Sequence, residues 1–341
     1  MKTDGFFNNS QLFWDMAREY IHHYLPDIRK SSPNTVASYR NSLNHYIDYL
    51  ERQIQILRKN ISFADFSRDN LKGYMDWMLN DGLLAPKTCN LRLTAIHSLL
   101  EYASNEQKEL MSSYISACSV KGVKTLAGPI EFFEPSQMKA LLSAPDTTKK
   151  TERRNQMMLI LMYELAARVS ELLDIKVSSL HVNSTVPYIT LLGKGRKYRN
   201  IPIMAKTQQH LSRYMKEFHN PQYADSPLFY ATTYGERHRL SADTVESMLK
   251  RYTSKCSTKV DMPDRPHCHM IRKTRAMDLY QNGVPLTHIQ QLLGHENLST
   301  TSGFYAFATL ETLANSMNKA SENTVEKQWH SRDTLARIYS L

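Results

Sequence analysis

The sequence predicts a mainly α-helical protein of two domains with a small β-hairpin or sheet. Apolar residues recur at helical spacing through most of the first 120 residues. Small and polar residues, among them two glycines and a proline, follow at 119–129 and indicate a linker. Further on, two runs of β-branched and aromatic residues flank a glycine-rich turn at 193–195. With 341 residues, the chain is long enough for two hydrophobic cores.

The N-terminal domain, residues 1–120, is expected to be a helical module. Polar caps or first-turn prolines mark four helix starts, which are Ser10, Ser32-Pro33, Ser67 and Ala85-Pro86. Gly82 is expected to end the third helix. Apolar stripes of this kind usually form a core. The predicted core positions are Leu12, Phe13, Met16, Tyr20, Tyr24, Val36, Tyr39, Leu43, Tyr46, Leu50, Leu71, Tyr74, Met78, Leu91, Ala95, Leu99 and Tyr102.

After a linker at 121–131, a second domain is expected at 132–318, followed by a C-terminal tail at 319–341. Pro135 opens a helix, and residues 154–165 are apolar enough for the central helix of this domain. Ser170 is the expected cap of the next helix, with Glu171 in its first turn, where the helix dipole favours a carboxylate. Strands at 188–192 and 199–203 then form a hairpin with Lys194 at its tip.

The charge balance favours a polyanionic partner. Lys and Arg number 43 against 33 Asp and Glu, which gives a formal net charge of +10 and a pI near 9.3. Four basic residues on the polar faces of the N-terminal helices are candidate DNA contacts, namely Arg40, Lys72, Lys87 and Arg92. The alternatives are a soluble basic enzyme and ordinary solvated side chains.

No membrane segment, secretion signal or metal site is expected. No run of apolar residues approaches 18, and the N-terminus lacks a signal-peptide pattern. The four cysteines are scattered, which fits a reducing cytoplasm. His267, Cys268 and His269 are adjacent, but neighbours in sequence diverge on a helix, so they do not predict a metal site.

The segment from His269 to Tyr305 carries the strongest chemical signal. His269 and Arg272 are three residues apart and project from one face of a helix. His295 follows a Leu-Leu-Gly that closes a second short helix, and Tyr305 comes ten residues later. Such groups can surround a phosphodiester and attack it. Lys194 lies between two glycines, but no phosphate-cradling loop is predicted because no Gly-Lys-Ser or Gly-Lys-Thr and no helix follow.

Taken in order, these motifs resemble the tyrosine recombinase (phage integrase) family. They are Arg168 followed by Val-Ser-Glu-Leu-Leu, Gly-Lys-Gly with Arg199 and Ile201-Pro202 downstream, HMIR, LLGH, and a tyrosine after Ser-Thr-Thr. The resemblance covers about residues 130–318. It extends more weakly to SPNTVASYRNSLNHYIDYL and PKTCNLRLTAIHSLLEYA, which look like the family's helical, SAM-like core-binding domain. It therefore implies that domain followed by a mixed α/β catalytic domain.

The resemblance implies transesterification of DNA without metal or cofactor. Tyr305 would attack the scissile phosphate and form a 3′-phosphotyrosyl bond. Lys194 would act as general acid and protonate the leaving 5′-oxygen.

The remaining catalytic roles also follow from the resemblance. Arg168 and Arg272 would bind the phosphate, because guanidinium groups grip it in a bidentate way and stay charged. His295 would donate a hydrogen bond to the phosphate, and His269 would assist as base or donor. Glu171 would buttress Arg168 and His269.

Three positions depart from the family pattern. The family commonly has Gly where this chain has Ala166, and often His where it has Lys273. Many relatives place the tyrosine nine residues after the histidine, which is Phe304 here. Tyr305 is one residue later, as if one residue had been inserted in the preceding loop. The alternative is an inactive enzyme with Phe304 at the nucleophile position. Tyr280 is a poor substitute, since it follows Arg272 by two turns of the same helix.

The expected function is site-specific recombination by an integrase of a phage or mobile element. The expected partners are duplex DNA with specific sites and three further copies in a homo-tetramer on DNA, with accessory directionality or host DNA-bending proteins as candidates. The expected location is the prokaryotic cytoplasm, at the nucleoid. In the family the C-terminal tail docks on a neighbouring protomer; the alternative is a tail packed on its own domain.

Three alternative functions remain open from the sequence. The first is an Xer-type recombinase that resolves chromosome dimers. The second is a type IB topoisomerase-like enzyme. The third is a DNA-binding regulator, because residues 269–295 also resemble a helix-turn-helix.

Overall fold

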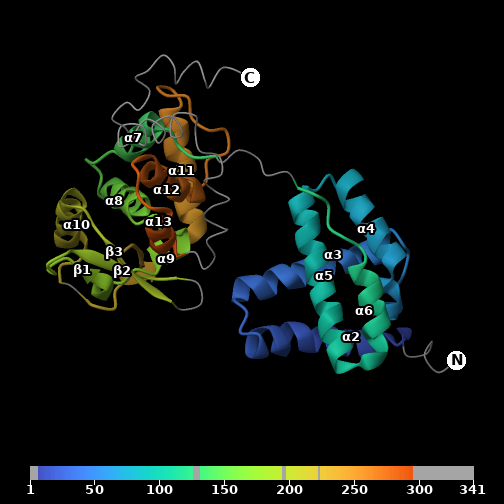
Figure 1. The fold of residues 1–341 in the computed structure, drawn as a ribbon. Helices are drawn as coiled ribbons and strands as arrows, with labels where there is room; N and C mark the ends of the chain where they lie inside the picture. The colour runs from blue at the N-terminus through green and yellow to red at the C-terminus, as the bar shows by residue number, and fades with distance from the viewer. Residues whose placement is uncertain (1–6, 126–130, 194–196, 222, 295–341) are drawn as a thin grey trace, which may run out of the picture. The chain divides into compact units, whose positions relative to one another are not determined.

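The computed structural model describes residues 7–125, 131–193, 197–221 and 223–294. The chain divides into two compact units, Met1–Gly128 and Pro129–Leu341 (Figure 1). The fold class is confirmed: helices dominate and the β-structure consists of small antiparallel sheets. No helix within the described ranges combines the length and the apolar character that a membrane span requires.

The N-terminal unit is helical throughout its described part. Its longer helices are α2 Ser10–Glu19, η1 Tyr20–Ile28, α3 Pro33–Arg52, α4 Arg68–Asn80, α5 Pro86–Glu106 and α6 Met111–Cys118. Helix η1 continues α2 with the wider winding of a π-helix. Short 3₁₀ turns connect the others at Arg58–Asn60, Phe63–Phe66 and Lys108–Leu110.

Most predicted helix starts are confirmed, and the first one is wrong by a residue. Ser32 and Ser67 cap α3 and α4, and Pro86 is the first residue of α5. The cap of α2 is Asn9, whose side chain accepts a hydrogen bond from the backbone N–H of Leu12. Asn caps helices as well as Ser does. The Ser10 hydroxyl instead donates to the carbonyl of Lys59.

The end of α4 also differs from the prediction. The helix ends at Asn80, close to the predicted stop, but the left-handed residue beyond it is Leu83, with φ of 47°. Gly82 does not have a positive φ. One predicted core position is wrong as well, because Leu91 is 49% exposed on α5.

The N-terminal core is rich in aromatic side chains. Its largest fully buried members are Phe13, Tyr20, Tyr46, Phe63, Phe66 and Tyr74. Their rings pack at centroid distances such as 4.8 Å between Tyr46 and Tyr74. Buried hydroxyls have partners, since Tyr46 donates to the carbonyl of Asp65 and Tyr20 donates to Ser98. The predicted stripes on the four helices therefore converge on one core.

The C-terminal unit combines helices with two small sheets. Its helices are α7 Pro135–Ser143, α8 Lys150–Glu164, α9 Val169–Leu173, α10 Ala205–Phe218, α11 Ala242–Cys256, α12 Cys268–Gln281 and α13 Leu286–Leu293. Its strands are β1 Leu180–His181, β2 Tyr188–Leu192, β3 Tyr198–Pro202, β4 Tyr230–Thr233 and β5 Glu236–Arg239. The sheet orders are β1-β2-β3 and β4-β5. Elements α10, β4, β5 and α11 were not among the predicted ones.

Register within the first sheet determines which side chains point inward. Strand β2 has the predicted bounds, whereas β3 begins at Tyr198 and ends at Pro202, one residue earlier than predicted. Leu191 pairs with Arg199, and directly opposite residues of an antiparallel pair lie on the same face. Because Leu191 is fully buried, Arg199 is also directed inward. Only 12% of its side chain is exposed.

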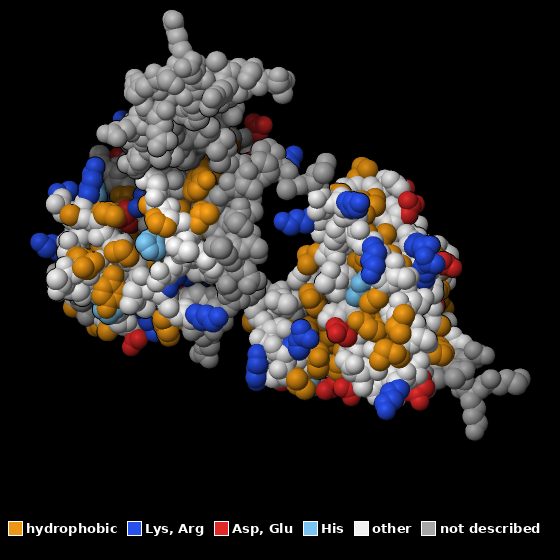
Figure 2. Space-filling view, in the orientation of Figure 1, with side chains coloured by type: hydrophobic (Ala, Val, Ile, Leu, Met, Phe, Trp, Pro, Cys, Tyr) orange, Lys and Arg blue, Asp and Glu red, His pale blue; other side chains and the backbone are white. Residues whose placement is uncertain are grey.

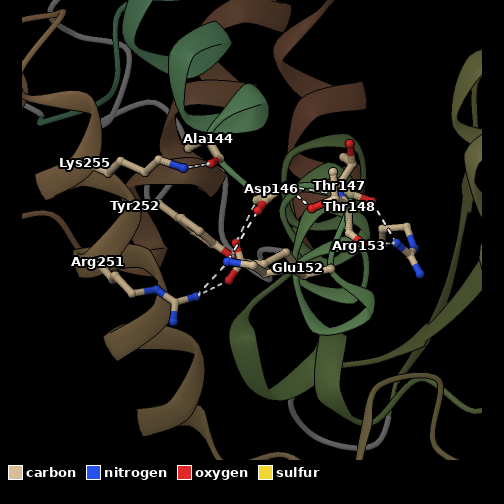
Figure 3. Close-up of polar contacts among 10 residues, drawn as sticks. Ala144, Asp146, Thr147, Thr148, Glu152, Arg153, Arg251, Tyr252 and Lys255 are labelled. Carbon is tan, nitrogen blue, oxygen red and sulfur yellow. Dashed lines mark hydrogen bonds and ion pairs between the residues drawn. The ribbon is translucent and has the colours of Figure 1, made fainter.

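A polar network fixes the beginning of the central helix α8 (Figure 3). Glu152 in its first turn accepts hydrogen bonds from Tyr252 at 2.6 Å and Arg251 at 2.8 Å, both on α11. Asn155, one turn further on, donates to the Tyr252 hydroxyl. Lys255 of α11 donates to the carbonyl of Ala144, which follows α7. Three helices are thereby tied together at one end of α8, and the other end leads to Arg168.

Candidate active site

A left-handed turn connects α8 to α9 and sets the direction of Arg168. Ala166 is fully buried and has φ of 45°, a conformation that costs an L-residue other than Gly about 1 kcal/mol. Arg168 then caps α9, and its backbone N–H donates to the Glu171 carboxylate at 2.8 Å. The predicted cap, Ser170, is wrong. It lies inside the helix, while Glu171 occupies the first turn as predicted.

Glu171 lies at the centre of three arginines drawn from separate parts of the chain. Its Oε1 accepts from Arg168 Nη1 at 2.6 Å and from Arg199 Nη1 at 3.0 Å. Its Oε2 accepts from Arg199 Nη2 at 2.7 Å, and Arg272 Nη1 lies 3.7 Å from the same atom. Glu171 is only 4% exposed. Burial opposes its ionisation, but the hydrogen bonds from Arg199 and Arg168 outweigh burial and lower the pKa of Glu171 to about 2.

Arg272 is the most deeply buried of the three arginines. It lies on α12 and donates to the carbonyl of Ala166 at 2.9 Å and to the carbonyl of Leu293. The left-handed turn at Ala166 and the end of α13 are thus both bound to one guanidinium. By contrast, Arg168 is 34% exposed, so it is the arginine of this group that is most open to solvent.

His269 precedes Arg272 by one turn on α12. Its pKa is lowered to about 4 by desolvation, by the neighbouring charges of Arg272 and Lys273, and by smaller contributions that include Arg168. The imidazole is therefore neutral near pH 7, with a lone pair that can accept a proton or a hydrogen bond. The backbone N–H of Cys268 at the start of α12 donates to the Glu246 carboxylate, which caps the helix from α11.

Two further segments lead towards the site, and in both the described residues end just before a predicted catalytic residue. Gly193 closes β2 and is followed by Lys194. Gly294 caps α13 in the left-handed conformation, with φ of 63°, and is followed by His295. Lys194, His295 and Tyr305 lie outside the described residues, as does the tail predicted at 319–341.

The structure thus brings Arg168, Glu171 and Arg272 together, with His269 close by. It also adds Arg199, which the sequence motif contains but to which no role was assigned. One signal could have identified it: an arginine opposite an inward-facing apolar residue of β2 needs a buried anionic partner.

The four basic residues of the N-terminal unit differ in their surroundings. Arg40, Lys72 and Lys87 are exposed on α3, α4 and α5. Arg92 is half-buried, and its charge, after desolvation, helps to lower the pKa of His45. Lys and Arg side chains are spread over the visible face of this unit among apolar patches (Figure 2). Three of the four residues are therefore accessible to a large anionic partner.

Comparisons with known proteins cover both units. Residues 131–311 match the family described as the phage integrase family, and residues 19–107 match the phage integrase, N-terminal SAM-like domain. Over 295 residues the chain is 30% identical to a Sinorhizobium fredii protein named as an integrase/recombinase, which covers 86% of this chain and 87% of that protein. It is 28% identical to the tyrosine recombinase XerC of Chlamydia caviae, over 82% of this chain and 90% of that protein.

Solved structures share the fold. The Tn1549 transposon integrase in complex with transposon right end DNA is 18% identical, with a TM-score of 0.67, and the match covers 92% of this chain and 99% of that chain. The XerH recombinase bound to palindromic difH substrate is also 18% identical, with a TM-score of 0.67, and the match covers 92% of each chain.

Proposed function

The chain belongs to the phage integrase family of tyrosine recombinases, and on that premise we propose that it cuts and rejoins DNA at specific sites through a 3′-phosphotyrosyl intermediate. One observation carries the proposal. Three arginines, from the start of α9, from β3 and from α12, surround the single carboxylate of Glu171 in one cluster. Such a cluster has an excess of positive charge that suits a phosphodiester and its more highly charged transition state.

Tyr305 would be the nucleophile. Its phenolic oxygen forms a bond to phosphorus while the bond from phosphorus to the 5′-oxygen breaks. Lys194 would give its proton to that 5′-oxygen, so the leaving strand departs as a hydroxyl. The reverse attack by a 5′-hydroxyl of a partner strand rejoins DNA. The bond energy is kept in the covalent intermediate, so this route requires no nucleotide cofactor.

The described residues would stabilise the phosphate during this exchange. Arg168 is suited to contact a non-bridging oxygen directly, because it is the most exposed of the arginines around Glu171. Arg272, which is buried behind Glu171, would add positive charge to the site. It would also hold the end of α13, which leads to His295. His269 would act as a neutral base or hydrogen-bond partner, as its lowered pKa allows.

The partner would be duplex DNA carrying recombination sites, bound by a homo-tetramer. Similar structures support this, including a lambda integrase tetramer bound to a Holliday junction. We favour a mobile-element or phage integrase. The alternative is an Xer-type role in resolving chromosome dimers, which relatives named XerC and XerD also support. The protein would act in a prokaryotic cytoplasm, at the nucleoid, with directionality or DNA-bending proteins as candidate helpers.

A nicked suicide substrate tests this function. The nick lies just beyond the scissile phosphate, so the short leaving strand diffuses away and the covalent complex accumulates. The wild-type protein should give a shifted DNA band on a denaturing gel, and protease should remove the shift. A DNA-binding regulator would give a shift on a native gel only. Joining of strands from two different duplexes would distinguish recombination from topoisomerase-like activity on one duplex.

Binding to the site should weaken steeply as salt rises. Each phosphate contact by Lys or Arg releases counterions, so even four such contacts cost about 10²-fold in affinity between about 50 and 200 mM salt. The dissociation constant, measured by fluorescence anisotropy across this range, gives the slope. A slope near zero would contradict binding through exposed basic residues such as Arg40 and Lys87.

A further inference from the structure

Arg199 joins three segments that lead to proposed catalytic residues. Its Nη1 and Nη2 donate to the two oxygens of Glu171, and its Nε donates to the carbonyl of Leu292 at 3.0 Å. Leu292 lies near the end of α13, 93 residues away in the chain. The side chain is nevertheless only 12% exposed. All three guanidinium nitrogens therefore bind protein groups on two different elements.

The same guanidinium packs against the two glycines that precede Lys194 and His295. A methyl group at Gly193 would lie 3.0 Å from Arg199 Nη1. A methyl group at Gly294 would lie 3.2 Å from the same nitrogen and 3.3 Å from Arg199 Cδ. Both distances are tighter than normal contacts, so the backbone approaches Arg199 this closely only because each residue is glycine.

We infer that Arg199 is a positioning residue for the general acid of strand cleavage: it holds the end of β2 at Gly193, which leads to Lys194, against Glu171 and the end of α13. This inference rests on the proposed function. Arg199 is not expected to contact DNA, because its three guanidinium nitrogens donate hydrogen bonds to Glu171 and Leu292. Its effect on the reaction passes through its neighbours.

Arginine is required for this arrangement, and lysine cannot replace it. The two parallel bonds to one carboxylate and the third bond to a carbonyl use the planar fork of a guanidinium. A lysine ammonium would keep the positive charge beside Glu171 but would lose at least one of the two connections. Arg199→Lys therefore keeps the positive charge and removes the hydrogen-bond geometry, so the variant tests the geometry alone.

The leaving group of the substrate provides the readout. If Arg199 aligns the general acid on the hairpin, Arg199→Lys should slow cleavage of the ordinary 5′-oxygen substrate at saturating DNA by about 10²-fold, the scale of a misplacement of roughly 1 Å. A substrate with sulfur in place of the bridging 5′-oxygen leaves as a thiolate and needs no proton. The same variant should cleave it within about threefold of the wild-type rate.

Arg239→Lys is the matched control. Arg239 also binds α9, through Asp174 at 2.6 Å and the carbonyl of Ser170, but its side chain is 43% exposed. This variant should cleave both substrates at wild-type rates. Native-gel affinity and circular dichroism should be unchanged for both variants, which excludes a loss of folding or of DNA binding.

Gly193→Ala is a second variant that disturbs the same contact from the hairpin side, should Arg199→Lys be poorly folded. It should show the same selective loss on the oxygen substrate. Equal slowing on both substrates, or wild-type rates in both variants, would overturn the inference. Failure of the wild-type protein to form any covalent complex would instead reject the proposed function.

Discussion

Tyr305→Phe is expected to abolish covalent protein–DNA complexes while leaving site binding unchanged. Phenylalanine keeps the aromatic ring but lacks the phenolic oxygen that would bond to phosphorus, so the covalent intermediate cannot form. A phenol has a pKa of about 10, and the positively charged cluster around Glu171 would favour its reactive phenolate. Denaturing gels with the nicked substrate measure the complex, and anisotropy measures binding.

The register of the nucleophile can be tested with the same assay. Tyr280→Phe, on α12 two turns after Arg272, should retain the complex. Moving the phenol back by one residue, in the double variant Phe304→Tyr and Tyr305→Phe, should not restore it. Complexes that persist in Tyr305→Phe would show that another nucleophile acts. Restoration by the double variant would show that the position nine residues after His295 is the reactive one.

Glu171→Ala is expected to destabilise the C-terminal unit by about 3–5 kcal/mol, because it leaves buried arginines without their counter-charge. Arg199 is 12% exposed and Arg272 is 2% exposed, so water cannot replace the carboxylate. Urea unfolding of the full chain, followed by circular dichroism, measures the loss. Hydrogen exchange of α9 peptides assigns it to this unit. Covalent complex formation should fall as well, since Arg168 loses its partner.

Asp174→Ala is the matched control for Glu171→Ala. Asp174 caps the other end of α9 and pairs with Arg239, but both side chains are nearly half exposed. An exposed pair of this kind contributes less than about 1 kcal/mol. If the two alanine variants unfold at the same urea concentration, the carboxylate of Glu171 does not have the structural role assigned to it.

The pH dependence of the Glu171 contribution has a definite sign. Its pKa is about 2 in the folded chain, below the ordinary value of 4.5 for a glutamate. The stabilisation is therefore fully present above about pH 4.5 and is lost as the pH falls towards 2. The difference between wild type and Glu171→Ala should shrink over that acidic range and stay constant near neutrality.

Patterns local in sequence predicted much of the fold. The starts of α3, α4 and α5 follow from Ser or Pro signals, and β2 follows from its β-branched residues. The errors at Asn9 and Arg168 concern caps, where neighbouring residues compete on nearly equal terms. Helices α10 and α11 bury apolar residues at helical spacing, so local patterns in the sequence were sufficient to predict them as well.

The site was harder to derive, because its geometry depends on contacts distant in sequence. The motif order singles out Arg168, Glu171 and Arg272, and the structure places both arginines beside the Glu171 carboxylate. The importance of Arg199 depends on strand register and on the approach of α13, which no local pattern encodes. Likewise, the left-handed backbone of Ala166 was not predictable from the residue type, because alanine rarely adopts a positive φ.

The charge of the Glu171 cluster is insensitive to the acidity of the cell. Three guanidiniums remain protonated throughout the physiological range, and the one carboxylate that opposes them remains ionised. The cluster therefore keeps two surplus positive charges in every growth condition. Any control of this chemistry would therefore have to act on access to DNA sites, on subunit assembly or on protein abundance.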